Sequence, residues 1–191
     1  MKIVIPAERP KYERALPGGI DLTLSPILKT DRAFFERGIE ELSLESRFAR
    51  FGQGVSSLSA QELDYLSDVN QRSHVAWGGV VGDEAAGVGR YIVTVDPKRA
   101  EIALTVLDQM QRRGVGRALF EALTAVARHD GIHEFAFEAR SDNEAVMSLL
   151  REIEVAPLVN DGVIERTIRL SDLPATPHDD ALVEVIEEVR G

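Results

Sequence analysis

Apolar positions along the chain follow two periods, one of two residues and one of about 3.6, which predicts a protein of strands and helices in mixed order. A strand is expected where apolar residues occupy every second position or form short β-branched runs. Asn160, Asp161 and Gly162 separate the last two such runs, and this sequence is typical of a tight hairpin turn. The predicted strands are residues 20–26, 75–81, 85–95, 101–107, 132–139, 155–159 and 163–170.

Helices are predicted where apolar residues recur every three to four positions. Two capping boxes, Ser59 with Glu62 and Ser141 with Glu144, mark helix starts, because the serine hydroxyl can accept from a free backbone amide while the glutamate reaches back. Gly131 is expected to close the longest helix. The predicted helical segments are residues 30–44, 46–54, 59–69, 115–130, 141–153 and 179–189.

These elements predict an α/β (α+β) fold, with a mixed, mostly antiparallel sheet of about seven strands and helices on both faces. The 191 residues suffice for one sizeable core and are too few for two ordinary domains. We expect a loosely held N-terminal arm over residues 1–19, a single domain over 20–170, and an acidic C-terminal tail over 171–191 with a short amphipathic helix. That helix is expected to pack on the body or on a second subunit, which leaves a homodimer open.

Charge and composition narrow the class of partner. Acidic residues outnumber basic ones by 32 to 22, a net charge of −10, so we expect no nucleic-acid partner and an attraction for cationic amines or lysine-rich surfaces. The chain has no cysteine, and its four histidines lack metal-ligand spacing, so no metal is expected. No run of ~18 apolar residues occurs, so no membrane segment is expected and a cytoplasmic protein is the default expectation.

A glycine-containing turn between a predicted strand and the longest predicted helix carries the chemistry. The first amides of a helix have no intrahelical partner and carry partial positive charge, and glycines let a diphosphate approach the backbone closely. Walker A requires a Gly-Lys pair, which is absent, and a dinucleotide fingerprint fails because Leu119 stands at the third glycine position. The turn consists of Gln111, Arg112, Arg113, Gly114, Val115, Gly116 and Arg117.

With this turn the chain resembles the GCN5-related N-acetyltransferases (GNAT), whose acetyl-CoA motif Gln/Arg-x-x-Gly-x-Gly/Ala is matched by Gln111, Gly114 and Gly116. The resemblance extends over about residues 20–170 and implies the GNAT fold with acetyl-CoA as co-substrate. A narrower resemblance, to the acetyltransferase domain of bacterial Pat-type protein-lysine acetyltransferases, rests on residues 44–51, 74–76, 90–91 and 100–103.

The resemblance also implies which residues hold the cofactor. The amides of residues 111–117 would bind its pyrophosphate. Asn143 would face the pantetheine arm, and the alternative is that it only stands in the first turn of a capped helix. The strand over residues 101–107 would bind the pantetheine arm and the thioester, through Leu104, Thr105 and Val106.

For the reaction itself, the resemblance implies a carboxylate base. An amine must be neutral to attack a thioester, whereas an alkyl ammonium has a pKa near ~10.4, so a base must take the proton. Glu101 matches the strand glutamate with this role in Pat-type enzymes, and Glu138 is the alternative base. Many family members carry a tyrosine acid where this chain has Leu150, and the usual Leu-Gly-Phe ending of that helix is also missing.

The expected function is transfer of an acetyl group from acetyl-CoA to a primary amine. Protein lysine is the favoured acceptor, and a cationic small molecule such as an aminoglycoside or a polyamine is the alternative within the same class. A non-catalytic acyl-CoA sensor that keeps the fold is the alternative from another class, because the tyrosine acid and the Leu-Gly-Phe ending are absent.

Overall fold

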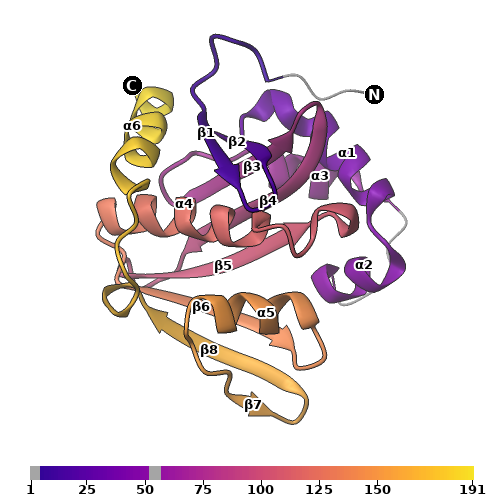
Figure 1. Ribbon diagram of the computed structural model, residues 1–191, viewed down its shortest axis with the longest axis vertical. Helices are drawn as coiled ribbons and strands as arrows, with labels where there is room; N and C mark the ends of the chain where they lie inside the picture. Colours follow the sequence, from indigo (N-terminus) through magenta and orange to yellow (C-terminus); the bar gives the residue numbers. More distant parts are fainter. Residues whose placement is uncertain (1–4, 52–56) are drawn as a thin grey trace.

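The computed structural model describes residues 5–51 and 57–191 and confirms the mixed α/β class. Within these residues one sheet of eight strands runs in the order β1-β2-β3-β4-β5-β6-β8-β7 (Figure 1), where about seven were expected. The paired strands of this sheet are antiparallel except β5 and β6. The strands are β1 Tyr12–Leu16, β2 Ile20–Pro26, β3 His74–Val81, β4 Glu84–Val93, β5 Arg99–Val106, β6 Glu134–Arg140, β7 Val159–Asn160 and β8 Val163–Arg169.

The strand that the sequence pattern missed is β1. It pairs with β2 from Tyr12↔Leu24 to Leu16↔Ile20, so the expected loose arm is wrong for this segment. Only Leu16 at its end is buried, because an edge strand with one solvated face carries polar residues between its apolar ones. Arg14 of this strand reaches Glu121 of helix α4 at 2.6 Å, a contact that no local pattern predicts.

Helices cover both faces of the sheet (Figure 1). Helices α4 and α5 lie on one face, where Leu119 and Leu123 of α4 join the main core with Phe135 of β6. Helices α1 and α3 lie on the other face, where Phe35 and Leu66 form a smaller core with strand residues. The helices are α1 Arg32–Glu41, α2 Leu44–Phe51, α3 Ala60–Ser67, α4 Val115–His129, α5 Glu144–Glu152 and α6 Asp179–Arg190.

The two predicted capping boxes have different outcomes. At α3, the Ser59 hydroxyl accepts from the Glu62 amide and the Glu62 carboxylate accepts from the Ser59 amide at 2.8 Å, which confirms the box. At α5, the box at Ser141 is wrong, because the cap is Asn143, whose Oδ1 accepts from the Val146 amide at 3.1 Å. An asparagine placed directly before the helix outcompetes the more distant serine.

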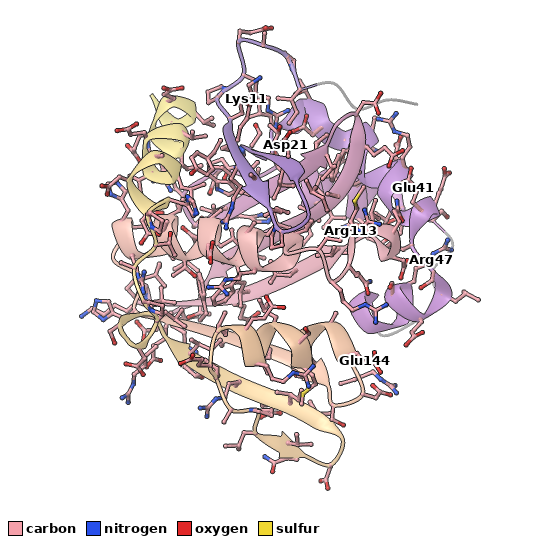
Figure 2. The ribbon with its side chains drawn as sticks, viewed as in Figure 1. Lys11, Asp21, Glu41, Arg47, Arg113 and Glu144 are labelled. Atoms are coloured by element: carbon pink, nitrogen blue, oxygen red, sulfur yellow. The ribbon has the colours of Figure 1, made fainter. Side chains whose placement is uncertain are left out.

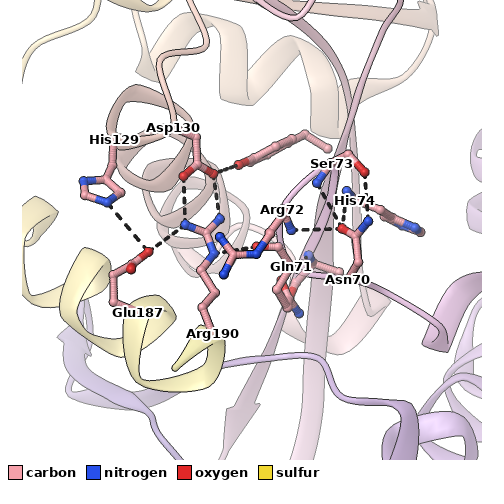
Figure 3. Close-up of polar contacts among 11 residues, drawn as sticks. Asn70, Gln71, Arg72, Ser73, His74, His129, Asp130, Glu187 and Arg190 are labelled. Carbon is pink, nitrogen blue, oxygen red and sulfur yellow. Dashed lines mark hydrogen bonds and ion pairs between the residues drawn. The ribbon is translucent and has the colours of Figure 1, made fainter.

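The acidic tail packs on the body of the domain through α6, in which Leu182 and Ile186 are fully buried. Arg190, with a side chain 4% exposed, donates to both carboxylate oxygens of Asp130 at 2.8 and 2.6 Å (Figure 3). The Tyr91 hydroxyl donates to the same carboxylate at 2.8 Å, and burial together with Asp130 raises the pKa of Tyr91. The sequence left two packing partners open for this helix, the body of the domain or a second subunit, and in the structure it packs on the body of the domain.

Strands β5 and β6 separate partway along their length. Their parallel pairing runs from Arg99↔Glu134 to Glu101↔Ala136, and no pair follows, although β5 continues to Val106 and β6 to Arg140. We call the point after Glu101↔Ala136 the fork. Beyond it, the edge of β5 that faces β6 carries no strand partner in the described part of the chain.

Candidate active site

The turn that enters α4 presents backbone amides at the end of β5. Gly114 stands before the helix with a φ of +89°, a conformation that residues with a Cβ rarely adopt. The first intrahelical bond runs from the Ala118 amide to the Gly114 carbonyl at 3.0 Å. The amides of Val115, Gly116 and Arg117 therefore have no acceptor within the helix, and the helix dipole adds partial positive charge there. An anion fits this place best.

Gly116 lies where α4 passes over β5. A Cβ added there would meet Val106 Cγ2 at 3.5 Å, an ordinary contact, so alanine fits at this position. The two glycines of the motif consequently differ: Gly114 is required by its backbone conformation, whereas Gly116 keeps the surface above the free amides open. Because alanine fits at Gly116, the substitutions Gly116→Ala and Gly116→Glu form a matched pair for testing anion binding.

The three arginines of the turn do not act alike. Arg112 and Arg113 are exposed, and Figure 2 shows Arg113 on the loop before α4. Arg117 instead donates through Nε to Glu121 at 2.8 Å, and Glu121 also pairs with Arg14 at 2.6 Å. Hydrogen bonding with Glu121 raises the pKa of Arg117. Burial acts to raise the pKa of the Glu121 carboxyl, but its two arginine partners outweigh burial and lower this pKa. Arg117 thus contributes to the turn through its amide.

Gln111 and Asp108 hold the turn in place. The Gln111 side-chain amide donates to the Val106 carbonyl at 3.2 Å and so folds the turn back onto β5. Asp108 accepts from the Ser43 amide at 2.8 Å and from the Ser46 hydroxyl at 2.7 Å, which ties the turn to the start of α2. Burial acts to raise the pKa of Asp108, but these hydrogen bonds outweigh it and lower the pKa. Sequence reasoning missed both serines because the contact spans more than 60 positions.

The predicted cofactor residues of β5 divide between two faces. Leu104 and Val106 pack into the main core toward α4, whereas Thr105 faces the opposite side, toward α1. Their shared feature is the main chain, which is open toward β6 beyond the fork. These side chains are therefore held by packing, and the backbone of the strand is the part available to a ligand.

Glu101 lies at the fork, on the same face as Thr105, and its side chain is exposed. Glu138, the alternative base, follows Ala136 by two positions on β6 and is also exposed on this face. It stands directly opposite Glu165 of β8, an unfavourable pairing of like charges. Carboxylates thus flank the fork on the uncovered face. No group of three or more His, Asp or Glu side chains in the described ranges has the geometry of a metal site.

Two further predictions concern α5, namely the role of Asn143 at its start and of Leu150 on its buried side. Asn143 caps the helix through Oδ1 and precedes its first turn, where the structural alternative had placed it, and its role toward a pantetheine arm stays a prediction. Leu150, at the position where the resemblance places a tyrosine acid, is 2% exposed and packs in the main core. No proton donor replaces it at that position.

In the described segments, none of the helices is long and apolar enough to cross a bilayer.

Comparison with known proteins agrees with this geometry. The model of the acetyltransferase (GNAT) family matches residues 36–153. The acetyltransferase Pat of Mycolicibacterium smegmatis is 27% identical over 169 residues, which are 86% of this chain; the chain spans half the length of that relative. The GNAT domain of S. lividans PAT superposes with a TM-score of 0.77 at 27% identity, covering 87% of this chain and 99% of that domain. Spermidine N-acetyltransferase from Vibrio cholerae, in complex with CoA and spermine, shares the fold with a TM-score of 0.62 at 17% identity, covering 79% of this chain and 96% of that one.

Proposed function

This chain belongs to the acetyltransferase (GNAT) family, and from that premise we propose that it transfers an acetyl group from acetyl-CoA to a primary amine. The observation that carries the proposal is the continuity between the open edge of β5 and the free amides at the start of α4. An extended arm that ends in a diphosphate matches such a surface, since its amides can pair with a strand edge and its phosphates with a helix N-terminus.

The cofactor contacts follow from this placement. The backbone amides of the turn from Gly114 to Arg117 bind the pyrophosphate, and the side chains of Arg112 and Arg113 add positive charge. The backbone of β5 from Leu104 to Val106 binds the pantetheine arm. Gln111 acts by holding the turn against β5.

For the chemical step, Glu101 accepts the proton of the amine, directly or through water. The neutral amine nitrogen then forms a bond with the thioester carbonyl carbon, the carbon–sulfur bond breaks as the sulfur leaves as a thiolate, and the nitrogen loses its second proton to water to give the amide. An ordinary thiol has a pKa of about 8.5, so the thiolate departs without the tyrosine acid that Leu150 replaces.

The acceptor we favour is a lysine side chain of a protein. The uncovered face around the fork carries exposed Glu101, Glu138 and Glu165, which attracts an ammonium group and leaves room for a macromolecular surface. The resemblance to M. smegmatis Pat and to S. lividans PAT supports this choice. The Vibrio cholerae complex with spermine keeps a small polyamine as the alternative acceptor.

Calorimetric titration of acetyl-CoA into the wild type, Gly116→Ala and Gly116→Glu tests the site. We expect the alanine variant to bind as the wild type does, because its Cβ meets only Val106 at 3.5 Å. The glutamate variant should lose about 100-fold or more in affinity, since juxtaposed like charges cost several kcal/mol. Equal binding by all three proteins would contradict pyrophosphate binding at this turn.

The core position of Leu150 favours one alternative, an acyl-CoA sensor without turnover. Release of free CoA in the presence of a lysine-peptide and polyamine panel separates the two functions. Amine-dependent release supports the transferase, whereas tight binding of acetyl-CoA with no release for any amine supports the sensor.

A further inference from the structure

A cavity of about 50 Å³ lies between the sheet and helix α1, on the face of β5 opposite α4. Thr105 of β5 and Val88 of β4, which are cross-strand neighbours, form part of its floor. Phe34 and Ile39 of α1, and Leu42 directly after this helix, are among the apolar side chains that line it. A volume of this size holds about three groups the size of a water molecule, and apolar cavities of this kind stay dry.

Gly38 of α1 lines this cavity and is not explained by packing. No atom lies within 4 Å of the position that its Cβ would take, so a larger side chain would project into open space. Glycine inside a helix is less favourable than alanine, because its backbone loses more conformational freedom on folding. The helix therefore keeps a destabilising residue where a side chain would fill the cavity, which indicates that the space is used.

The charge around the cavity indicates what it can hold. Arg90, 4% exposed, is the charged residue among its described lining; its guanidinium lies 5.4 Å from the centre of the Phe35 ring. A second positive charge beside the buried guanidinium of Arg90 would be repelled, so the cavity does not suit an ammonium group. An uncharged aliphatic chain fits it.

The cavity lies directly behind the strand that holds the thioester in the proposed function. Thr105 contributes its side chain to the cavity and its main chain to the open edge of β5. Ala103, beside Arg90 in the register, is the small residue between the cavity and Glu101. The amine and the aliphatic chain thus have separate places on one face of β5, the amine at the carboxylates and the chain at the cavity.

We propose that this cavity receives the acyl chain of acyl-CoA substrates longer than acetyl, with butyryl, three carbons beyond its carbonyl carbon, as the best match to its size. The proposal rests on the proposed function, since it assumes that β5 holds the thioester. Gly38 is then a specificity-determining residue whose missing side chain leaves room for the acyl chain.

The test is calorimetric titration of CoA, acetyl-CoA and butyryl-CoA into the wild type and into Gly38→Ala and Gly38→Leu. Burying two further methylene groups, at about 0.8 kcal/mol each, should make butyryl-CoA bind about 15-fold more tightly than acetyl-CoA to the wild type. Gly38→Leu should remove this preference while CoA binds as before, and Gly38→Ala should reduce it. Ala33→Leu, which also introduces leucine but at an exposed position of α1, is the control that keeps the preference.

The outcomes separate the two proposals. If acetyl-CoA binds and butyryl-CoA binds no more tightly, the acyl-chain proposal is overturned and the proposed function stands. The acyl-chain proposal is also overturned if Gly38→Leu keeps the full preference. If neither CoA nor either thioester binds, the proposed function fails and the acyl-chain proposal falls with it. Should Gly38→Leu not fold, the Gly38→Ala variant decides, because alanine favours a helix over glycine.

Discussion

The two ends of one face of β5 differ in almost every physical property. At the end near Thr105 and Leu107, helix α1 closes over an apolar cavity whose charged lining residue is Arg90. At the other end, Glu101 stands exposed at the fork, with Glu138 and Glu165 on the neighbouring strands. A single strand can serve two chemically different groups when helices cover only half of its sheet face. The covered half is lined mostly by apolar side chains, whereas the uncovered half carries the three glutamates together with exposed Arg99 and Arg140.

The largest expected effect lies at the carboxylate end. Glu101→Gln removes the proposed base without changing its size, so the turnover number should fall by at least about 100-fold while the affinity for acetyl-CoA stays the same. Steady-state kinetics with a lysine peptide, together with calorimetry, measures the two quantities. Glu138→Gln is the matched control, and we expect it to keep most of the turnover. The reverse result would assign the base to Glu138.

A smaller effect is expected from pH at His74, which contacts Arg90 and lies level with Glu101 in the register of the sheet, two strands away. Because burial and Arg90 lower the pKa of His74 from 6.5 to about 4, the unfolded state binds a proton between these values while the folded state does not. Stability should therefore fall as the pH drops from 6.5 toward 4, by up to about 2 kcal/mol for this partly screened side chain. Urea unfolding at pH 7.5 and pH 5 measures the change.

His74→Gln keeps a hydrogen-bond acceptor for Arg90 and removes the titrating group. Its stability should depend less on pH over this interval than that of the wild type. An unchanged pH dependence in the variant would mean that His74 is not the group whose protonation destabilises the fold at low pH.

The smallest effect is expected at Glu165. Glu165→Gln should raise the KM for a lysine-rich peptide about threefold at low ionic strength and leave the turnover number unchanged, because the residue attracts the acceptor without touching the reacting atoms. Removing the like-charge pair with Glu138 should also stabilise the fold by a few tenths of a kcal/mol. Glu188→Gln, the same charge change on α6, is the control. Equal KM values for both variants at low salt would argue against local steering by the fork carboxylates.

Local sequence patterns predicted the parts of the fold whose interactions span a few residues. The cap at Ser59 is an example, since both partners lie within one helical turn. The hairpin between β7 and β8 is another: Asp161 and Gly162 have φ values of +49° and +79°, as a two-residue turn of this type requires. The turn before α4 belongs to the same class, because its glycines and its place after a strand are visible in the sequence.

Contacts between distant segments escaped prediction for a physical reason. The pattern of β1 is ambiguous until β2 pairs with it, and the separation of β5 from β6 depends on where parallel pairing stops. Asn143 shows the same limit locally, since two capping residues competed and the geometry of the loop selected one. None of these choices is encoded by periodicity alone.

The sequence by itself determined the order of the elements after β1, the glycine-containing turn before α4 and the two glutamates that are candidates for the proposed base. The tertiary structure decided that Glu101 lies at the fork, that the Arg117 side chain donates to Glu121, and that a cavity lies beside Gly38. Hydrogen bonding within a turn depends on neighbours in the chain, and these are written in the sequence. Cavities, exposed carboxylates and strand separation depend on which surfaces meet, and only the packed fold decides that.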